Sequence, residues 1–468
     1  MSDNTDVKVK ENIIQRLGNG FGRWASRYFP DAIIFALGLW VLVFILSMAV
    51  AKAPFFSTWK YAGEGLWGVL TFSTQVSLTL MWSTMLANMP VITKFLDKLT
   101  DIPKTPMQAY IMTYIISGAA DLLSWALGLI VGGVLCTYFG RKMKGVDYPF
   151  MVATSYASFA IWHGGFSGTI PLAIGTEGSI CADYMKELIP SNNFIFHPVN
   201  LILIALGLFL VPFTLTKIMA PPKEKVIEVD PNLLQVKDLN YPTPPKSEWV
   251  PIQKVEFGQL FKWIMGVGIL GYYCYYFATK GIGGLDLNSL NGLLMGVCVL
   301  LSKHLMDYGE RAKDAARGMG TLFIQFPIYG MIMSMCTKSG LAEIISNAIV
   351  SIATPKTLPN IINISSSILN MIIPSGGGKF SVEAPIYFPA IYKVGAPVMP
   401  VLLGSAWGDA LTNLIQPFWA LPLLAIANLG IRDIVGYEII YCIFMFIIIQ
   451  VVLAIWMHTA ADGYETIY

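Results

Sequence analysis

A serine followed by three glycines, Ser375, Gly376, Gly377 and Gly378, interrupts a long apolar stretch of the chain. Glycine tolerates positive φ and lets a ligand approach the backbone closely. A helix that starts at such a turn offers unpaired N–H groups and the positive end of its dipole to an anion. A tight turn that only needs permissive residues is the alternative. Because the surrounding segment is apolar enough to lie in a membrane, we predict that the turn binds an anionic substrate.

A lysine follows these glycines, and Lys379 and Glu383 stand four residues apart. On a helix such a pair lies side by side and can neutralise itself, or the lysine can meet the substrate; both interpretations stay open. No arginine falls within the long apolar segments, whereas a dicarboxylate or phosphate site often recruits a forked guanidinium group. A substrate with one negative charge, met by helix ends and one lysine, fits better.

A second polar run interrupts another apolar segment and contains His163, Gly164, Gly165, Ser167 and Thr169. It supplies one imidazole, two hydroxyl groups and backbone amides at a place where the glycines break the helix. We predict that this run contributes to the same substrate site.

Two carboxylates, Asp121 and Asp409, lie within apolar segments, where a charge costs about 2.5–3.5 kcal/mol on the insertion scale. Ser124 follows the first, and Thr412 and Asn413 follow the second. Oxygen ligands at an unwound helix suit a hard cation such as Na⁺, and a carboxylate can instead carry a proton. An aspartate that caps a half-helix is the structural alternative. We predict a role in ion coupling and leave the ion open.

Composition defines the class of protein. The 468 residues are 55% hydrophobic and 13% charged, with a net charge of +2 and a mean hydropathy of +0.60. Soluble domains carry about 25% charged residues, so a soluble multidomain enzyme is excluded. The net charge is too small for a nucleic-acid binder. Six scattered cysteines form no C-x-x-C pair, which argues against a disulfide framework or a zinc site. The sequence predicts an all-α polytopic membrane protein without a resident cofactor.

The apolar segments predict about nine transmembrane helices and two re-entrant hairpins. A crossing needs about 20 apolar residues, and uninterrupted candidates occur seven times: 31–51, 66–89, 196–218, 258–278, 286–302, 317–336 and 434–457. Gly and Pro interrupt two broken helices, 148–176 and 397–428. The stretches 107–139 and 360–395 are too long for one crossing, at about 1.5 Å per residue, and too short for two full ones. We therefore expect helical hairpins.

Charge distribution predicts the orientation. With the N-terminus in the cytoplasm, 22 Lys and Arg residues lie on the inner face and seven on the outer face, as the positive-inside rule expects. This places a cytoplasmic or interfacial segment at 1–30, in which 13–28 reads as an amphipathic helix, a cytoplasmic linker at 219–256 and an outer tail at 458–468. Two short full crossings in place of each hairpin would give the same count.

The two halves, 31–218 and 281–457, show the same order of elements, and the connecting helix 257–280 would invert the second. Local matches support this pairing: Pro103-Lys104-Thr105 recurs as Pro355-Lys356-Thr357, each just before a hairpin. Inverted repeats with interrupted helices are typical of secondary transporters, with a site near the bilayer midplane. The amphipathic stretches after the second helix of each half could be arms between a scaffold and a transport domain, or simple interfacial connectors.

Four segments resemble the short-chain fatty acid transporter family, the AtoE-type permeases of the ion-transporter superfamily. They are WASRYFPDAII at 24–34, WHGGFSGTIPL at 162–172, PSGGG at 374–378 and QPFWALPLLAIANLGIRDI at 416–434. The resemblance implies a carrier in the bacterial inner membrane that imports acetoacetate, butyrate and similar acids, coupled to Na⁺ or H⁺. It also implies an elevator-like movement, with a small carboxylate and the lipid bilayer as partners. Elevator carriers are often homo-oligomers, dimers or trimers, and the oligomeric state of this chain stays open.

Three other functions are weighed against this one. A carrier of C4-dicarboxylates or other organic anions would use the same scaffold. An intramembrane enzyme would pair His163 with an aspartate but has no need of duplicated hairpins, so the repeat speaks against it. A channel would not show saturable uptake that depends on an ion gradient.

Overall fold

The computed structural model of the chain describes residues 32–230, 234, 241, 243–373 and 375–459. Every regular element within these ranges is a helix, as predicted. The predicted amphipathic helix 13–28, Pro374 and nearly all of the predicted outer tail lie outside the described residues.

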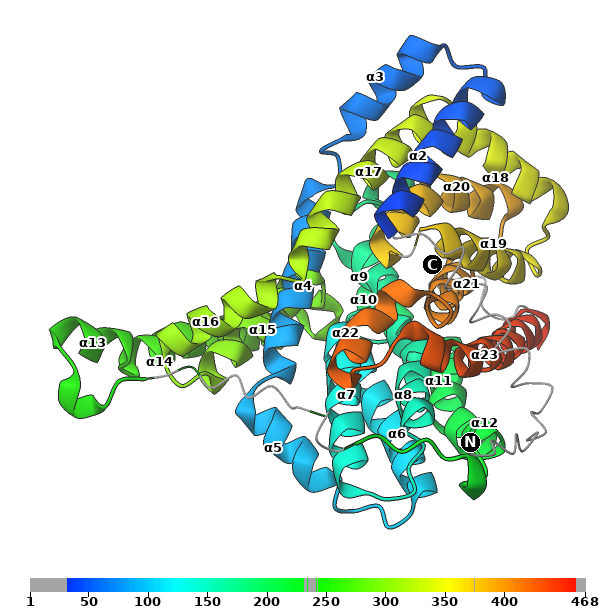
Figure 1. Cartoon of the computed structure of the whole chain (residues 1–468). Coiled ribbons are helices and arrows are strands. Elements are labelled where there is room, and N and C mark those ends of the chain that lie inside the picture. The colour runs from blue at the N-terminus through cyan, green and yellow to red at the C-terminus, as the bar shows by residue number, and fades with distance from the viewer. Residues whose placement is uncertain (1–31, 231–233, 235–240, 242, 374, 460–468) are drawn as a thin grey trace, which may run out of the picture.

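The first half contains eleven numbered α-helices and one prominent 3₁₀ segment (Figure 1). They are α2 (Ala32–Ala49), α3 (Phe55–Gly65), α4 (Leu70–Ala87), α5 (Pro90–Leu99), α6 (Pro106–Leu123), α7 (Trp125–Lys142), α8 (Tyr148–Ala157), η1 (Ser158–Gly164), α9 (Thr169–Gly175), α10 (Ser191–Ile195), α11 (Pro198–Ala205) and α12 (Val211–Met219).

The second half follows the segment between α12 and α13. Its helices are α13 (Pro251–Glu256), α14 (Leu260–Lys280), α15 (Leu287–Leu301), α16 (Leu305–Ala316), α17 (Met319–Lys338), α18 (Leu341–Ile352), α19 (Leu358–Ile372), α20 (Gly376–Val394), α21 (Val398–Asn413), α22 (Pro417–Ala427) and α23 (Ile431–Thr459).

Two continuous helical rods in the described residues, 198–219 and 431–459, are long and apolar enough to cross a membrane by themselves. A π-helical turn, Leu206–Leu210, joins α11 to α12 in the first of these rods. Helices α4 and α5 pass the same test only as a pair, and they meet at an angle of 59°. The other predicted crossings consist of shorter helices, so the predicted number of crossings stays a prediction.

Helix breaks occur within all four interrupted stretches. The first predicted hairpin contains α6 and α7, which Ser124 separates in an extended conformation. The second contains α19 and α20, with Ser375 extended before α20. The segment between η1 and α9 breaks one predicted broken helix, and the segment between α21 and α22 breaks the other.

Two groups of helices lie side by side in the molecule. Helices α14, α15 and α16 project from the body and reach it along α4, while α2 and α17 border the second hairpin and α3 packs on both of them (Figure 1). The exposed face of α14 is apolar, with Trp263, Ile264 and Val267 all about half exposed. A lipid-facing helix has this pattern, because no water contacts that face.

Helix α19 fastens to α21 through polar side chains that reach backbone carbonyl groups. Asn363 Nδ2 donates to the carbonyl oxygen of Gly404 at 2.9 Å, and Ser366 Oγ donates to that of Ser405 at 2.8 Å. Gly404 and Gly408 form a small-residue stripe of the kind that lets membrane helices approach closely. A Cβ on Gly404 would overlap the carbonyl oxygen of Pro359.

Comparable contacts join α6 to the helix that follows its hairpin. Ser117 Oγ lies 3.1 Å from Ser155 Oγ of α8, and Ser158 Oγ of η1 donates to Asp121 Oδ2 at 3.0 Å. The first helix of each hairpin thus contacts the broken helix of the same half through hydroxyl or amide groups. The inverted repeat itself remains a prediction.

We expect Gly404→Ala to lower the melting temperature of the detergent-purified protein by several degrees. The added methyl group forces α19 and α21 apart, and overpacking of this kind costs about 1–3 kcal/mol. The matched control is Gly271→Ala in α14, where nothing lies within 4 Å of an added Cβ. Alanine there should be neutral or slightly stabilising, since glycine is the poorer helix former. Equal melting temperatures for both variants would contradict the close packing.

Candidate functional site

Two backbone amides at the N-terminus of α20 have no hydrogen-bond partner among the described residues. The first N–H groups of a helix have no intrahelical partner. Ser375 Oγ accepts from the N–H of Gly378 at 3.2 Å, and the N–H of Lys379 donates to the Ser375 carbonyl oxygen at 2.7 Å. The amides of Gly376 and Gly377 are the ones that these contacts leave for a ligand. They also lie at the positive end of the helix dipole, which favours an anion.

The three glycines are required because other elements press against this helix end. A Cβ on Gly376 would lie 3.0 Å from Thr169 Oγ1 and 3.2 Å from His163 Cε1, so the helix end meets the first broken helix. A Cβ on Gly377 would overlap the ring of Phe72, and one on Gly378 would overlap that of Tyr329. The second hairpin therefore contacts α4 and α17 at its turn.

The imidazole of His163 is fully hydrogen-bonded inside the protein. The N–H of Ile170 donates to Nε2 at 3.0 Å, so the proton of a neutral ring lies on Nδ1, which donates to Asp409 Oδ2 at 3.0 Å. The ring also stacks on Trp162, with centroids 4.3 Å apart. His163 thus joins the two broken helices and orients the site, and both of its nitrogens are already engaged.

A buried charge cluster lies next to this ring. Lys379 Nζ lies 3.0 Å from both carboxylate oxygens of Glu383 and 3.7 Å from Asp409 Oδ1, and all three side chains are fully buried. Ser405 Oγ and the Tyr387 hydroxyl donate to Glu383. Of the two roles left open for Lys379, the pairing with Glu383 is the one present here. With a neutral His163, the cluster contains two carboxylates and one ammonium group.

Asn370 of α19 ties the polar residues of α21 together. Its Nδ2 lies 2.9 Å from Thr412 Oγ1, 2.7 Å from Asn413 Oδ1 and 2.8 Å from the Asp409 carbonyl oxygen. Asn413 Nδ2 lies 3.4 Å from Asp409 Oδ2. The predicted trio of Asp409, Thr412 and Asn413 is therefore one connected network. Nitrogen donors contact Asp409 Oδ2, whereas Oδ1 has no hydrogen-bond partner in the described structure and lies 3.7 Å from Lys379 Nζ. The ammonium group of Lys379 thus balances the charge of this carboxylate.

The predicted residues of the first hairpin lie in other contacts. Asp121 faces Ser158, and its Oδ1 has no hydrogen-bond partner in the described structure. Ser124 Oγ contacts Ser83 Oγ of α4, and Ser167 Oγ accepts from the N–H of Trp125 at 2.8 Å. These residues do not join the cluster around Lys379.

Gly164 and Gly165 act as packing residues. A Cβ on Gly164 would come within 2.7 Å of Asn200 Oδ1, and one on Gly165 would overlap the carbonyl group of Leu122. The N–H of Phe166 donates to that same carbonyl oxygen at 2.7 Å. The two glycines therefore bring the first broken helix against the turn of the first hairpin.

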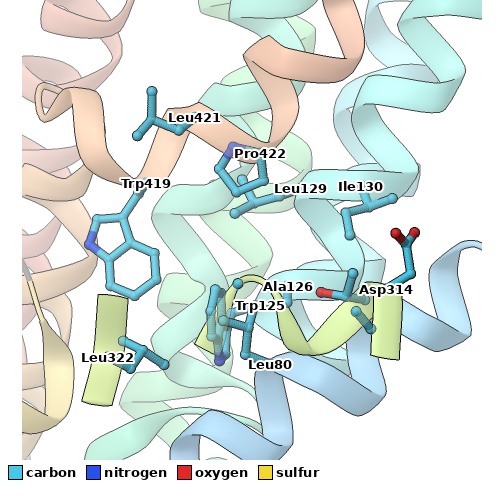
Figure 2. A pocket seen from close by; sticks show the side chains of 13 residues that line it. Leu80, Trp125, Ala126, Leu129, Ile130, Asp314, Leu322, Trp419, Leu421 and Pro422 are labelled. Carbon is cyan, nitrogen blue, oxygen red and sulfur yellow. The ribbon is translucent and has the colours of Figure 1, made fainter. Parts of the chain in front are cut away.

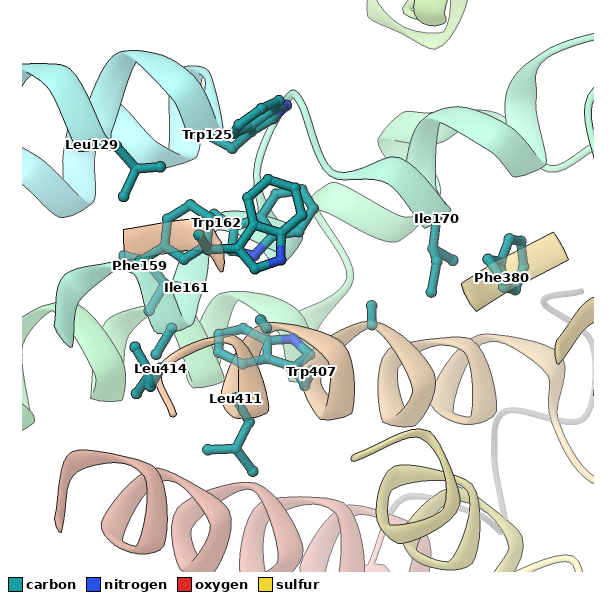
Figure 3. Packing of buried hydrophobic residues seen from close by; sticks show 14 of the residues in the cluster. Trp125, Leu129, Phe159, Ile161, Trp162, Ile170, Phe380, Trp407, Leu411 and Leu414 are labelled. Atoms are coloured by element: carbon teal, nitrogen blue, oxygen red, sulfur yellow. The ribbon is translucent and has the colours of Figure 1, made fainter. Parts of the chain in front are cut away.

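A cavity of about 340 Å³ lies between these elements and the helices that border them (Figure 2). Leu80 of α4 and Leu322 of α17 form one side, and Trp125 of α7 and Trp419 of α22 form the other. Trp419 in turn lies 6.2 Å from Trp162, centroid to centroid. Trp125, which also lines the cavity, lies 6.5 Å from Trp162, centroid to centroid (Figure 3). Both cavity tryptophans thus lie near Trp162, against which Gly376 packs.

Several residues that build the site were not predicted from the sequence. Asn363, Ser366 and Asn370 share one face of α19, and their spacing of three and four residues was a detectable signal. Gly404 and Gly408 form a G-x-x-x-G pair that marks close helix packing. Glu438 is a lone carboxylate in the last apolar segment and is fully buried.

Known proteins match the chain over nearly its whole length. A family described as "Short chain fatty acid transporter" matches residues 13–456. A protein of Escherichia coli, named "Putative short-chain fatty acid transporter", is 31% identical over 444 residues, which cover 95% of this chain and all of that protein. A protein of Haemophilus influenzae with the same name is 30% identical and covers 91% of this chain and 96% of its own length.

Two solved transporters share the fold. The YdaH transporter of Alcanivorax borkumensis superposes with a TM-score of 0.58 at 15% identity, over 93% of this chain and 99% of its own. Neisseria gonorrhoeae MtrF, described in a study of antimetabolite efflux pumps, gives 0.56 at 14% identity, over 94% and 98%. The protein is accordingly a multi-pass helical membrane transporter rather than an enzyme. The family match over 13–456 shows that this chain belongs to the short-chain fatty acid transporter family.

Proposed function

We propose that the protein imports short-chain monocarboxylates such as butyrate and acetoacetate in symport with a cation. The observation that carries the proposal is the meeting of the α20 amides with Thr169 and His163, close to an aromatic cavity. The family and the names of its relatives supply the substrate class. The bias of basic residues supports an inner-membrane orientation with a cytoplasmic N-terminus and an outer C-terminus.

One negative charge on the substrate matches the groups available. The amides of Gly376 and Gly377 can each donate one hydrogen bond to a carboxylate, and the hydroxyl of Thr169 lies beside them. The ammonium group of Lys379 is held by Glu383 and Asp409. A second carboxylate on the substrate would find no further basic group in 360–395 or 397–428 apart from Lys393 at the end of α20. This distribution disfavours dicarboxylates.

The alkyl tail would extend into the cavity beside Trp125, Trp419 and Leu322. Each buried CH₂ contributes about 0.8 kcal/mol, so three carbons contribute about 2.4 kcal/mol in total. The carboxylate must therefore supply much of the affinity. Discrimination between neighbouring chain lengths should be weak, because one methylene group changes binding only a few-fold.

The contacts between the two hairpins and helices α4 and α17 support an elevator-like movement. Both hairpin turns face helices that we assign to the scaffold, Ser124 against Ser83 of α4 and Gly378 against Tyr329 of α17. The amphipathic helices α5 and α18 follow α4 and α17 and contact the second helix of a hairpin. Lys142 of α7 pairs with Asp97 of α5 at 2.8 Å, and α18 packs on α20. We assign α5 and α18 as arms between scaffold and transport domain.

Purified protein in liposomes should accumulate labelled butyrate when a cation gradient is imposed. Propionate and valerate should compete within about tenfold of butyrate, since one CH₂ is worth about 0.8 kcal/mol, whereas succinate should compete poorly. Protein-free liposomes measure the passive entry of undissociated acid. Uptake of labelled succinate in preference to butyrate would favour the dicarboxylate carrier instead.

A disulfide between Ser83→Cys and Ser124→Cys should block uptake reversibly. The two hydroxyl groups are in contact across α4 and the first hairpin, so a cysteine pair there is within bonding reach. The background would lack the six native cysteines. Each single variant, treated with the same oxidant, serves as the control and should retain uptake. A cross-linked protein that still transports after oxidation would contradict movement of this hairpin against α4.

Asp409→Asn should abolish gradient-driven accumulation while exchange of internal for external substrate continues. The amide keeps an acceptor for His163 but removes one negative charge from the cluster, so a co-transported cation is no longer needed to balance it. Glu64→Gln, which changes an exposed carboxylate paired with Lys338, is the matched control. Normal concentrative uptake by Asp409→Asn would remove this carboxylate from ion coupling.

A further inference from the structure

Glu438 of α23 is buried inside the protein and has no hydrogen-bond partner among the described residues. Its side chain is fully buried on α23, and neither carboxylate oxygen has a hydrogen bond in the described structure. Such a group is costly in its ionised form, because burial removes the water that would stabilise the charge. A buried carboxylate that costs free energy and makes no stabilising contact is more readily explained by a function than by a structural role.

Three buried tyrosines, Tyr114, Tyr156 and Tyr441, lie within electrostatic range of Glu438. Tyr114 of α6 is fully buried, and its hydroxyl also lacks a partner. Tyr114 and Tyr156 of α8 both lie within electrostatic range of Glu438 and of Asp121. The Tyr156 hydroxyl donates to the Asn413 carbonyl oxygen at 2.7 Å, next to the network of Asp409. Both tyrosines are thus within electrostatic range of the same two buried carboxyl groups, Glu438 and Asp121.

Among the residues that the structure describes, no basic side chain pairs with Glu438. The titratable groups near it are Tyr114, Tyr156, and Tyr441 and Cys442 of its own helix. Helices α11, α19 and α22, which also pack against α23, carry no ionisable side chain, and Asp409 of α21 faces His163 and Lys379. Helix α12 approaches through Thr216, and its Lys217 lies over the Phe213 ring instead.

We propose that Glu438 binds the coupling proton of this carrier and exchanges it with Asp121 by way of Tyr114. The step moves one proton between two carboxyl groups: the donor acid becomes a carboxylate, the acceptor carboxylate becomes an acid, and the tyrosine passes one proton on while it receives another. A hydroxyl group both donates and accepts, which suits it to this role. The unpartnered Oδ1 of Asp121 is available as the other end of the route.

The proposal rests on the import function proposed above and selects the proton as its coupling ion. A Na⁺ site would need several oxygen atoms grouped around one point, whereas Glu438 supplies one carboxylate and its electrostatic neighbours are tyrosines and Cys442. At the cluster around Lys379, the ammonium group lies 3.7 Å from Asp409 Oδ1 and already supplies a positive charge, which disfavours a second cation there. Glu438 and Asp409 therefore have different tasks, since one carries the proton and the other sets the charge balance at the substrate.

The test measures uptake of labelled acetoacetate into liposomes that contain the full-length protein, under separate pH and Na⁺ gradients. A gradient of one pH unit is worth about tenfold accumulation for one proton, or 1.36 kcal/mol. Protein-free liposomes give the passive background. In the wild type we expect the pH gradient to drive accumulation. In Glu438→Gln we expect that drive to disappear, while counterflow without a gradient stays within about twofold and loses its dependence on pH.

Tyr114→Phe provides the second variant, because it removes only the hydroxyl group. We expect slower gradient-driven uptake and unchanged counterflow, whereas a purely structural role would impair both equally. Glu343→Gln on α18, an exposed carboxylate, is the control that should change nothing. Full pH-driven accumulation by Glu438→Gln, or accumulation in the wild type driven by Na⁺ alone, would overturn the proposal. Absence of any counterflow in the wild type would instead refute the import function.

Discussion

Backbone groups left unpaired where helices stop inside an apolar interior are the constraint on which this structure depends. A helix that ends there leaves N–H and C=O groups that water cannot satisfy. Here backbone groups at one helix break form hydrogen bonds with residues at another helix break. The N–H of Phe166 reaches the carbonyl oxygen of Leu122, Ser167 accepts from the N–H of Trp125, and Gln416 donates to the carbonyl oxygen of Asn370. These mutual contacts fix the hairpins and broken helices relative to one another.

The amides of Gly376 and Gly377 are the exception, and their position explains why they are left unpaired. They stand where α20 meets Thr169 and the rings of Phe72 and Trp162. An added Cβ would overlap the Phe72 ring at Gly377 and would be tightly packed against Thr169 at Gly376. The glycines thus permit close packing and also keep the amides free of a side chain that would shield them from a ligand. Packing and binding make the same demand on these residues, so sequence alone could not separate the two explanations.

Much of the architecture could be predicted because apolar length and glycine position are local properties. The breaks at Ser124 and Ser375 fall where hairpin turns were expected, and the run from His163 to Thr169 interrupts its helix as expected. Partner choice could not be predicted, because it depends on tertiary contacts. Nothing in the sequence showed that His163 would contact Asp409, 246 positions away, or that Ser124 would meet Ser83 rather than Asp409.

The residues that sequence analysis missed are polar. Their helical spacing can be read from the sequence, but the groups that they contact cannot. Asn363, Ser366 and Asn370 repeat at helical spacing within an otherwise apolar helix, yet a polar stripe can face water, lipid headgroups or another helix. Its actual target, the backbone of α21, is identified only by the close approach at Gly404 and Gly408. Glu438 was hidden for a similar reason, since a single carboxylate in an apolar run has no local partner.

The cavity is lined by α4 and α17, which we assign to the scaffold, and by α7 and α22, which we assign to the transport domain. It forms one space only while the scaffold and the transport domain keep the alignment seen here. A sliding movement of the transport domain past the scaffold would divide it. An acid whose hydrocarbon part fills the cavity would contact both domains at once. It would stabilise this one alignment and could not move with the transport domain. Longer fatty acids should consequently be inhibitors that are bound without being carried, and the upper limit on cargo length would come from the movement rather than from affinity.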